Sequence, residues 1–194
     1  MPTHFKTKYS VDKASKNYYS FLNLALSKLK IFLHGIKSGK ASIIEKNVNI
    51  NLTDNAKFYF GDHSVISSNS LIHLTKPKPN LYIGNFVSIG FGSMILVKCN
   101  TYIDNYTRIG AYVTIRDHIK KDVNTKGKKI IESKTAFKNV KIGKNVWIGN
   151  YSTIFPGVTI GDNSIVSAYS FVTENVPKNC VVAGQPARIV KKIK

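Results

Sequence analysis

Few side chains in this sequence are suited to acid–base, nucleophilic or metal chemistry. The 194 residues include five histidines, two cysteines and one tryptophan, Trp147. An imidazole gains and loses a proton near neutral pH, so each histidine is a candidate for proton transfer. Cys99 and Cys180 lie far apart and form no CxxC pair, which favours neither a disulfide framework nor a zinc site. We therefore expect a cytoplasmic protein without a bound metal.

A fixed period of six residues is the strongest pattern around these candidates. Neither a helix nor an alternating hairpin produces such a register over a long run. Stacked coils of three hexads produce it, with about 18 residues in each coil and about 4.8 Å between coils. Glycine often follows the repeated residue, where a sharp turn favours a residue without Cβ. The pattern predicts an all-β parallel β-helix with inward-facing aliphatic residues at Ile83, Ile89, Ile95, Ile103, Ile109, Ile115, Ile142, Ile148, Ile154, Ile160, Val166 and Val172, and a fainter register at Phe60, Ile66 and Ile72.

The register fails between Ile115 and Ile142, in a polar and lysine-rich stretch. We expect an excursion loop over residues 117–139. A loop of roughly 20 residues inside a compact domain is usually functional or disordered. His118, in VTIRDHIKK, stands at the start of this excursion, whereas the other four histidines do not.

Residues 1–40 lack the repeat and predict a basic amphipathic helix, ahead of a β-helix domain over residues 41–194. A helical stripe runs along Tyr19, Leu22, Leu26, Leu29, Leu33 and Ile36, with Lys28, Lys30 and Lys37 elsewhere around the wheel. Such a helix can pack against the first coil or a neighbouring subunit, or it can lie on a membrane. No apolar run is long enough to span a bilayer, and the start of the chain has no signal-peptide pattern.

The formal net charge is +19, with a pI near 9.9. The lysines are spread along the chain and accompany no nucleic-acid-binding motif, so we expect no nucleic-acid partner. The charge suits the phosphates of coenzyme A, an acidic glycan or an anionic membrane surface at the inner face.

The stretch KIGKNVWIGNYSTIFPGVTIGDNSIVSAYSFVTENVPKNCVVAGQPARIVKKI, residues 141–193, resembles the C-terminal half of the galactoside/maltose O-acetyltransferase branch of the hexapeptide acyltransferases. Capsule and lipopolysaccharide O-acetyltransferases are similar in layout. The resemblance implies a left-handed coil, a homotrimer with clefts between neighbouring chains, acetyl-CoA as co-substrate and transfer of an acetyl group to a sugar hydroxyl, a modification made to cell-surface polysaccharides.

The resemblance also implies the roles of individual residues. His118 corresponds to the general base that takes the proton of the attacking hydroxyl, and Asp117 either orients its imidazole or caps the turn. Trp147 corresponds to a residue beside the thioester arm and the histidine, and plain packing is the alternative. Because negative charge develops on the thioester oxygen during attack, we expect a backbone N–H near Gly149 and Asn150 to be the oxyanion donor. The coenzyme contacts are the backbone at Asn150, Ala168 and Thr173 for the pantetheine arm, and Arg188 with Lys191 for the phosphates.

The acceptor site is less defined by the sequence, because Gly90 stands close to where galactoside-type enzymes carry an asparagine. Arg116 is a candidate for an acidic acceptor, and Asn69, His73, Lys98 and Tyr102 are candidates to line another pocket. N-acetylation of an amino sugar remains an alternative, because the coenzyme site would be the same. A non-catalytic β-helix that binds a polyanion is a further alternative. The histidines offer no three-ligand zinc set of the carbonic anhydrase kind.

Overall fold

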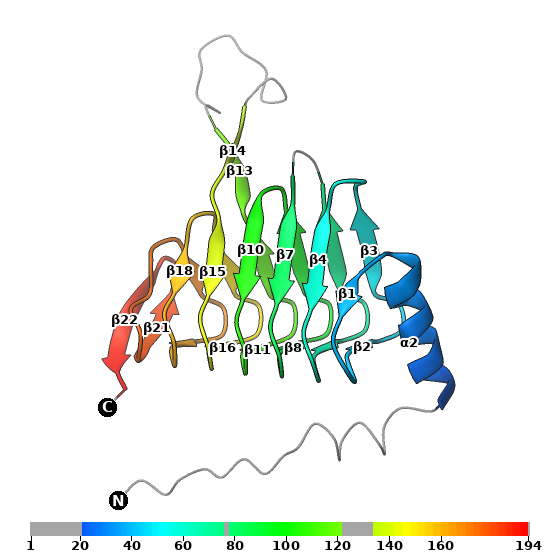
Figure 1. Ribbon diagram of the computed structural model, residues 1–194. Coiled ribbons are helices and arrows are strands. Elements are labelled where there is room, and N and C mark those ends of the chain that lie inside the picture. The colour runs from blue at the N-terminus through cyan, green and yellow to red at the C-terminus, as the bar shows by residue number, and fades with distance from the viewer. Residues whose placement is uncertain (1–20, 76–77, 122–133, 194) are drawn as a thin grey trace, which may run out of the picture.

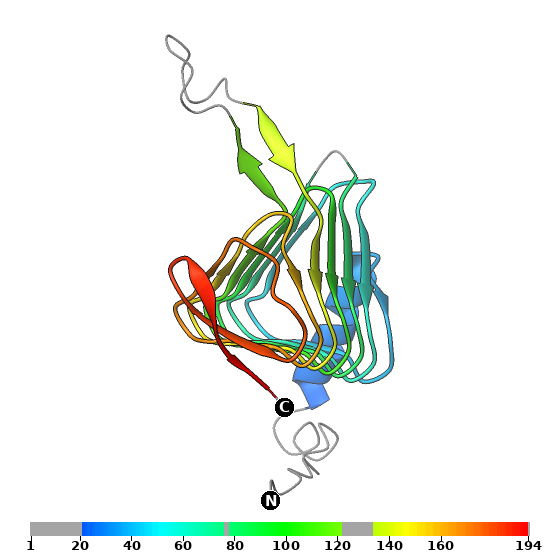
Figure 2. The ribbon, with the colours of Figure 1, turned by 90° about the vertical axis from the view of Figure 1, so that its left-hand side faces the viewer.

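The structure, a computed structural model, describes residues 21–75, 78–121 and 134–193, and it is a parallel β-helix of about six turns. Each turn contributes one short strand to each of three sheets, which form the faces of a triangular prism (Figures 1 and 2). In Figure 1 the chain descends the front sheet, crosses the base toward the back, rises again and advances to the left, so the coil is left-handed.

We name the three sheets faces A, B and C. Edge 1 joins A to B, edge 2 joins B to C, and edge 3 joins C to A. Face A consists of β1 (Lys37–Ser38), β4 (Lys57–Phe60), β7 (Asn80–Ile83), β10 (Asn100–Ile103), β15 (Val140–Ile142) and β18 (Thr159–Ile160). Face B consists of β2 (Ile43–Ile44), β5 (Val65–Ile66), β8 (Ser88–Ile89), β11 (Arg108–Ile109), β16 (Trp147–Ile148), β19 (Ile165–Val166), β21 (Cys180–Gly184) and β22 (Ala187–Lys192). Face C consists of β3 (Asn49–Leu52), β6 (Leu71–Leu74), β9 (Met94–Val97), β12 (Thr114–Arg116), β17 (Thr153–Ile154) and β20 (Phe171–Val172).

The sixfold period places the predicted aliphatic residues inside the prism. All twelve are at most 4% exposed, and Phe60, Ile66 and Ile72 are buried with them. Buried serines between them bond to carbonyls of the next coil; Ser164, for example, donates to Pro177 O over 2.7 Å. Burying one isoleucine stabilises the fold by roughly 1.5–3 kcal/mol, so the stacked rows hold the prism together.

The glycines of the repeat serve close coil packing rather than a left-handed turn. None of Gly84, Gly90, Gly110, Gly143, Gly149 and Gly161 has a positive φ, but a Cβ at each would lie 2.3–2.5 Å from an atom of the next coil. The left-handed residue comes two positions later. At edge 2 it is Tyr112, Tyr151 and Tyr169, with φ of 55°, 58° and 57°.

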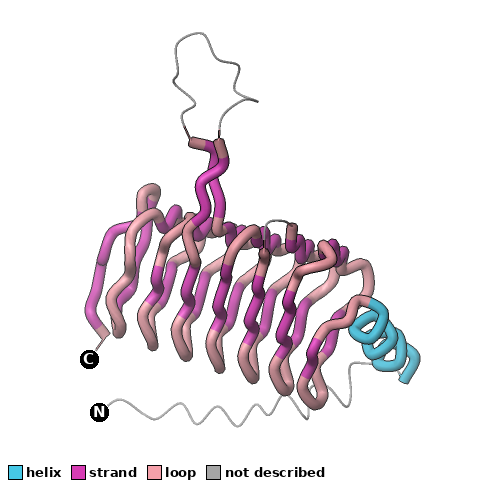
Figure 3. The backbone as a smooth tube through the Cα atoms, turned by 45° about the horizontal axis from the view of Figure 1, so that its top comes forward, coloured by secondary structure: helices cyan, strands magenta, loops and turns pink. Residues whose placement is uncertain are grey.

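Helix α2 (Phe21–Leu33) lies across the N-terminal end of the prism (Figure 3). The buried Ser27 hydroxyl accepts the backbone N–H of Ile44 over 2.8 Å, and Ile31 is also buried. The Lys30 ammonium donates to Val48 O, and its burial lowers the pKa of Lys30. In contrast, Leu26, Leu29 and Leu33 of the predicted stripe are 51–69% exposed. The helix therefore contacts the first coils through a narrower face than the sequence suggested, and Tyr19 lies outside the described residues.

The excursion leaves the prism at edge 3 as an antiparallel pair, β13 (His118–Lys120) and β14 (Thr135–Phe137). It stands out from the coils in Figures 1 and 3. His118 pairs with Phe137 at its base. No helix in the described ranges is both long and apolar enough to cross a lipid bilayer.

Candidate active site

Asp117 is the centre of the bond network at edge 3. Its side chain is fully buried, and its carboxylate accepts the backbone N–H groups of Lys98 and Cys99 over 2.8 and 2.9 Å. Its own carbonyl accepts the N–H of Lys138 over 2.8 Å, where the excursion returns. Through these hydrogen bonds, Asp117 connects the start and the end of the excursion to the preceding coil.

His118 lies beside this carboxylate. Its Nδ1 is 3.2 Å from Oδ1 of Asp117, and its side chain is 22% exposed. A carboxylate accepts hydrogen bonds only, so in the neutral ring the pair favours the proton on Nδ1 and leaves Nε2 as a free acceptor. A partly exposed imidazole with a fixed tautomer is the arrangement that a general base requires.

The Cys99 thiol is close to this pair but is poorly suited to act as a nucleophile. Burial, together with the nearby Asp117 carboxylate, raises the pKa of Cys99 to about 11. A nucleophilic cysteine needs the thiolate, and this environment favours the thiol. Of the two side chains beside the Asp117 carboxylate, the His118 imidazole is therefore the better candidate for acid–base chemistry.

Face C leads up to His118 and carries Arg116. The Arg116 guanidinium carbon lies 4.8 Å from the centre of the Phe155 ring, a cation–π geometry. The buried Nε of Arg116 has no hydrogen-bond partner among the described residues. A half-buried cation next to the candidate base is suited to an anionic group of an acceptor.

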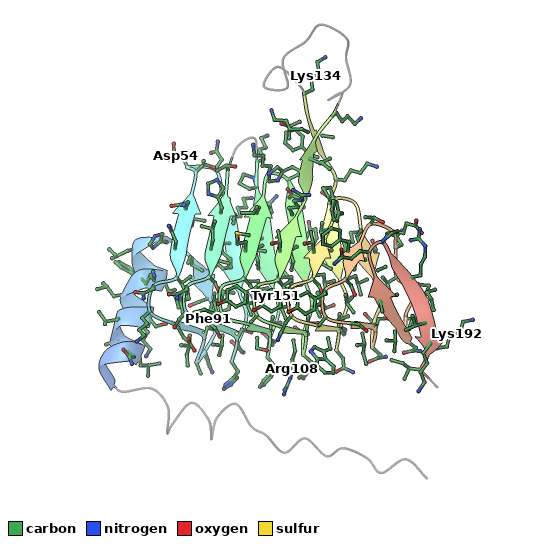
Figure 4. The ribbon with its side chains drawn as sticks, turned by 180° about the vertical axis from the view of Figure 1, so that it is seen from behind. Asp54, Phe91, Arg108, Lys134, Tyr151 and Lys192 are labelled. Carbon is green, nitrogen blue, oxygen red and sulfur yellow. The ribbon has the colours of Figure 1, made fainter. Side chains whose placement is uncertain are left out.

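Trp147 lies on a different face. It belongs to β16 on face B, where it is 57% exposed and in register with Arg108. Face B forms the base of the prism in Figure 1, whereas the pair β13–β14 rises from the opposite edge. Figure 4 shows Arg108 on this base, seen from behind. Within one chain, Trp147 and His118 therefore do not share a site.

The candidate pantetheine contacts Asn150 and Ala168 lie on successive turns of edge 2, and both are exposed. The Gly149 N–H donates to Val166 O over 2.7 Å, so it is already used. The N–H of Asn150 makes no recorded hydrogen bond within the described part of the chain, because Ala168 supplies no side-chain acceptor. Of the two predicted oxyanion donors, only Asn150 has a free N–H.

Arg188 and Lys191 lie on β22, the last strand, and both are exposed. The Arg188 guanidinium is 3.4 Å from the Glu174 carboxylate, and both side chains are more than half exposed. Thr173 follows β20 at the end of face C. An exposed ion pair is weak and exchanges readily, so Arg188 is available to a phosphate.

The four acceptor candidates do not line one pocket in a single chain. Asn69 is a left-handed residue at edge 2, His73 lies on face C with its Nδ1 3.5 Å from Asn51 Nδ2, and Tyr102 lies on face A. Only His73 and Arg116 share a face, and Lys98 follows the end of β9 near Asp117.

Sequence analysis missed an aromatic ladder at edge 2. The rings of Tyr112, Tyr151 and Tyr169 stack at 5.0 and 4.9 Å, and Phe91 packs edge-on against the first (Figure 4). The signal was present, because each tyrosine stands three residues after an inward Ile or Val. The ladder directly follows Asn150 and Ala168 in the chain, so it borders the candidate pantetheine contacts.

Within the described ranges, no three His, Cys, Asp or Glu side chains are grouped so as to hold a metal ion. The candidate groups are an imidazole and a carboxylate at edge 3, the free N–H of Asn150 at edge 2, and exposed cations on β22. This set can transfer a proton, stabilise an oxyanion and bind phosphates.

Comparison with known proteins agrees with this reading. Residues 139–174 match the bacterial transferase hexapeptide (six repeats) family. The chain is 54% identical over 54 residues to galactoside O-acetyltransferase of Escherichia coli (strain K12), a match that spans 28% of this chain and 27% of that enzyme. The matched part is thus about a quarter of the relative's length.

Two solved structures share the fold over most of the chain. AntD, an N-acyltransferase from Bacillus cereus in complex with dTDP and 3-hydroxybutyryl-CoA, superposes with a TM-score of 0.75 at 21% identity, covering 87% of this chain and 89% of AntD. The polySia specific acetyltransferase NeuO superposes with a TM-score of 0.53 at 26% identity, covering 81% of each chain. The C-terminal coils therefore carry the hexapeptide repeat of bacterial transferases and are similar in sequence to part of galactoside O-acetyltransferase.

Proposed function

We propose that this chain transfers an acetyl group from acetyl-CoA to a hydroxyl of a sugar, with His118 as the general base. The observation that carries the proposal is the Asp117–His118 pair at 3.2 Å, placed at the exit of the excursion in a hexapeptide-repeat fold. A sugar hydroxyl is a poor nucleophile near neutral pH, so its proton must be removed as it attacks the thioester.

The chemical steps follow from these atoms. Nε2 of His118 accepts the hydroxyl proton while the sugar oxygen forms a bond to the thioester carbonyl carbon. The carbonyl oxygen becomes an oxyanion that accepts a hydrogen bond from the free N–H of Asn150, which lies at edge 2 and so comes from the neighbouring chain in the shared site proposed below. Collapse of the tetrahedral adduct breaks the C–S bond, and the leaving thiolate takes the proton from His118. Asp117 stabilises the imidazolium in between.

His118→Ala tests the base directly. Turnover should fall by about 100-fold or more, whereas the Kd of acetyl-CoA should change little, because the imidazole acts on the acceptor. His63→Ala is the control, since His63 lies at edge 1, where its ring stacks on Phe86 at 5.0 Å, and it is not a candidate for the site. An unchanged rate in His118→Ala would end the assignment.

Trp147 and His118 lie on different sides of one chain. We therefore propose a homotrimer in which each active site is shared by two neighbouring chains. Mixing His118→Ala chains with Trp147→Ala chains should restore activity, since about a quarter of the sites in a random trimer receive both intact residues. Sedimentation of a stable monomer, or no restoration on mixing, would contradict shared sites.

Amine acceptors form the second candidate class, because AntD, which shares the fold, is described as an N-acyltransferase. An amine needs less help from a base than a hydroxyl does. Assaying matched pairs of sugars that differ only in a hydroxyl or an amino group separates the two. Transfer confined to the amine, with little dependence on His118, would favour this class.

An acidic glycan is the acceptor that the charge supports best. The net charge is +19, the Arg116 guanidinium is half-buried two residues before His118, and NeuO is described as polySia specific. Exposed charges are screened within about 8 Å at physiological salt, so the KM for an acidic acceptor should rise steeply with ionic strength. Activity restricted to neutral sugars without salt dependence would contradict an acidic acceptor.

We further propose that α2 contacts the inner membrane face from the cytoplasm. Leu26, Leu29, Phe32 and Leu33 are 51–80% exposed on its outer side, and the helix contains no acidic residue. An amphipathic helix of this kind binds anionic lipid surfaces. Sedimentation with phosphatidylglycerol vesicles should retain the wild type and lose a Leu29→Gln/Leu33→Gln variant. Equal sedimentation of both proteins would contradict the contact.

A further inference from the structure

Three tyrosines form a straight row on the outer surface of face A. Tyr59, Tyr82 and Tyr102 are direct partners in the register of β4, β7 and β10, which stand side by side at the front of Figure 1. Their side chains are 36%, 43% and 40% exposed. Large aromatic side chains are usually buried, so an exposed row of three marks a surface for binding.

These rings differ from the aromatic ladders at the edges. At edge 1, Phe86 stacks on Tyr106 at 5.4 Å, and at edge 2 the tyrosines stack likewise, so ring faces are hidden against each other. The face A tyrosines make no ring–ring contact within the described part of the chain. No other described ring therefore covers them, whereas the ammonium of Lys37 lies 5.5 Å from the centre of the Tyr59 ring and already contacts that ring.

A row of amides runs beside the tyrosines on the same face. Asn80 and Asn100 precede Tyr82 and Tyr102 by two residues, a spacing that points side chains to one side of a strand. Asn80 Nδ2 donates to Asn100 Oδ1 over 2.7 Å, and Asn100 Nδ2 donates to Asn139 Oδ1 over 2.9 Å. Each amide has four hydrogen-bonding positions, so the row keeps donors and acceptors for hydroxyl groups.

The amide row leads to the candidate base. Asn139 stands two residues after Phe137, and Phe137 is the strand partner of His118 at the root of the hairpin. A chain molecule lying along Asn80, Asn100 and Asn139 would therefore arrive at the edge where His118 lies.

Cations border this surface. Lys57 pairs with Asn80 at one end of the amide row, and Lys141 pairs with Tyr102 at the far end of the tyrosine row. A hollow of about 310 Å³ adjoins Tyr102 and is lined also by Tyr82 and Lys141, with the carboxylates of Asp104 and Asp162 on its edge 1 side. Aromatic faces, amides and ammonium groups together match the apolar ring faces, hydroxyls and carboxylates of an acidic sugar chain.

We propose that face A binds an acidic oligosaccharide chain and guides it to His118, so that Tyr82 and Tyr102 set a preference for polymeric acceptors. The guiding of a glycan to His118 rests on the proposed acetyl transfer. Glycan binding itself does not, because it is measurable without acetyl-CoA. The coils repeat at about 4.8 Å, a spacing similar to one sugar unit, so successive units would meet equivalent side chains.

Calorimetry with a sialic acid hexamer, in the absence of acetyl-CoA, tests the surface. The double variant Tyr82→Ala/Tyr102→Ala should weaken binding about 10-fold or more, whereas Tyr106→Ala, an exposed tyrosine at edge 1, should bind like the wild type. Maltohexaose should bind far more weakly than the acidic hexamer. Thermal unfolding and sedimentation of each variant accompany the titrations.

Three results would overturn the proposal. Undiminished binding by the double variant would remove the tyrosines from the site. If maltohexaose binds as tightly as the sialic acid hexamer, the lysines do not contribute to binding through the carboxylates of the glycan. Loss of the oligomer in the double variant would make face A an interface between copies of the chain. If the glycan binds as expected but no acetyl transfer is found, face A is still a glycan-binding surface, whereas the proposed function is wrong.

Discussion

Oδ1 of Asp117 lies 3.2 Å from Nδ1 of His118, and it also accepts the backbone N–H of Lys98. The carboxylate therefore orients the imidazole and holds the preceding coil with the same atoms. Asp117 was predicted to orient the ring or to cap the turn, and the geometry supports both.

Asp117→Asn should therefore affect turnover and stability together. An amide has one acceptor oxygen, so either Lys98 or Cys99 loses its partner, and the negative charge beside the imidazolium is lost. We expect kcat to fall by about 10-fold or more, and the free energy of unfolding to fall by about 1–3 kcal/mol. Turnover assays and urea unfolding measure the two effects, with the exposed Asp54→Asn as control. A normal kcat in a destabilised variant would limit Asp117 to capping the turn.

Gly149→Ala should destabilise the coil stack. The added Cβ would lie 2.4 Å from the backbone nitrogen of Ala168, and a backbone atom cannot move aside as a flexible side chain can. We expect a loss of roughly 1–3 kcal/mol, the usual cost of overpacking. Urea unfolding gives the measurement, and Ser88→Ala on the outside of face B is a control of similar size. Wild-type stability in Gly149→Ala would show that the coils separate more easily than the geometry implies.

The Arg188–Glu174 pair predicts opposite effects on coenzyme binding. Arg188→Ala should weaken the binding of coenzyme A by about 1–3 kcal/mol, because a charge-assisted contact is lost. Glu174→Lys should tighten it, since the substitution removes a competing carboxylate 3.4 Å from the guanidinium and adds a cation. Titration calorimetry with coenzyme A and with 3′-dephospho-coenzyme A tests both. If Arg188→Ala weakens both ligands equally, Arg188 does not contact the 3′-phosphate.

Cys99 should resist alkylation at neutral pH. Burial raises the pKa of its thiol to about 11 from an ordinary value of 9.0, so the reactive thiolate appears only at high pH. The raised pKa means that the folded protein holds this proton more tightly than the unfolded chain does. The associated stabilisation is present below pH 9.0 and is lost as the pH rises toward about 11. Iodoacetamide labelling against pH, with Cys99→Ser as the blank, measures the midpoint. A midpoint near neutrality would contradict the assigned environment.

The period of six determined most of the fold from sequence alone. A fixed spacing of Ile and Val is a local property of the chain, and it prescribes which side chains point inward regardless of distant contacts. All twelve predicted inward residues are therefore buried. His118 was also singled out from the sequence, because it stands where that register stops, and its role as a base stays a prediction.

Other features depended on how distant residues meet, and only the tertiary structure decided them. The helix α2 buries Ser27 and Ile31 instead of the leucine stripe, because Ser27 bonds to Ile44 in the first coil. The glycines of the repeat allow the next coil to pack closely, and they do not provide a left-handed backbone conformation in their own turn. Asn69, His73 and Tyr102 were grouped by residue type, yet the coil assigns them to an edge and two different faces. Face assignment depends on each residue's position within an 18-residue coil, so a row such as Tyr59, Tyr82 and Tyr102 emerges only when the coils are stacked.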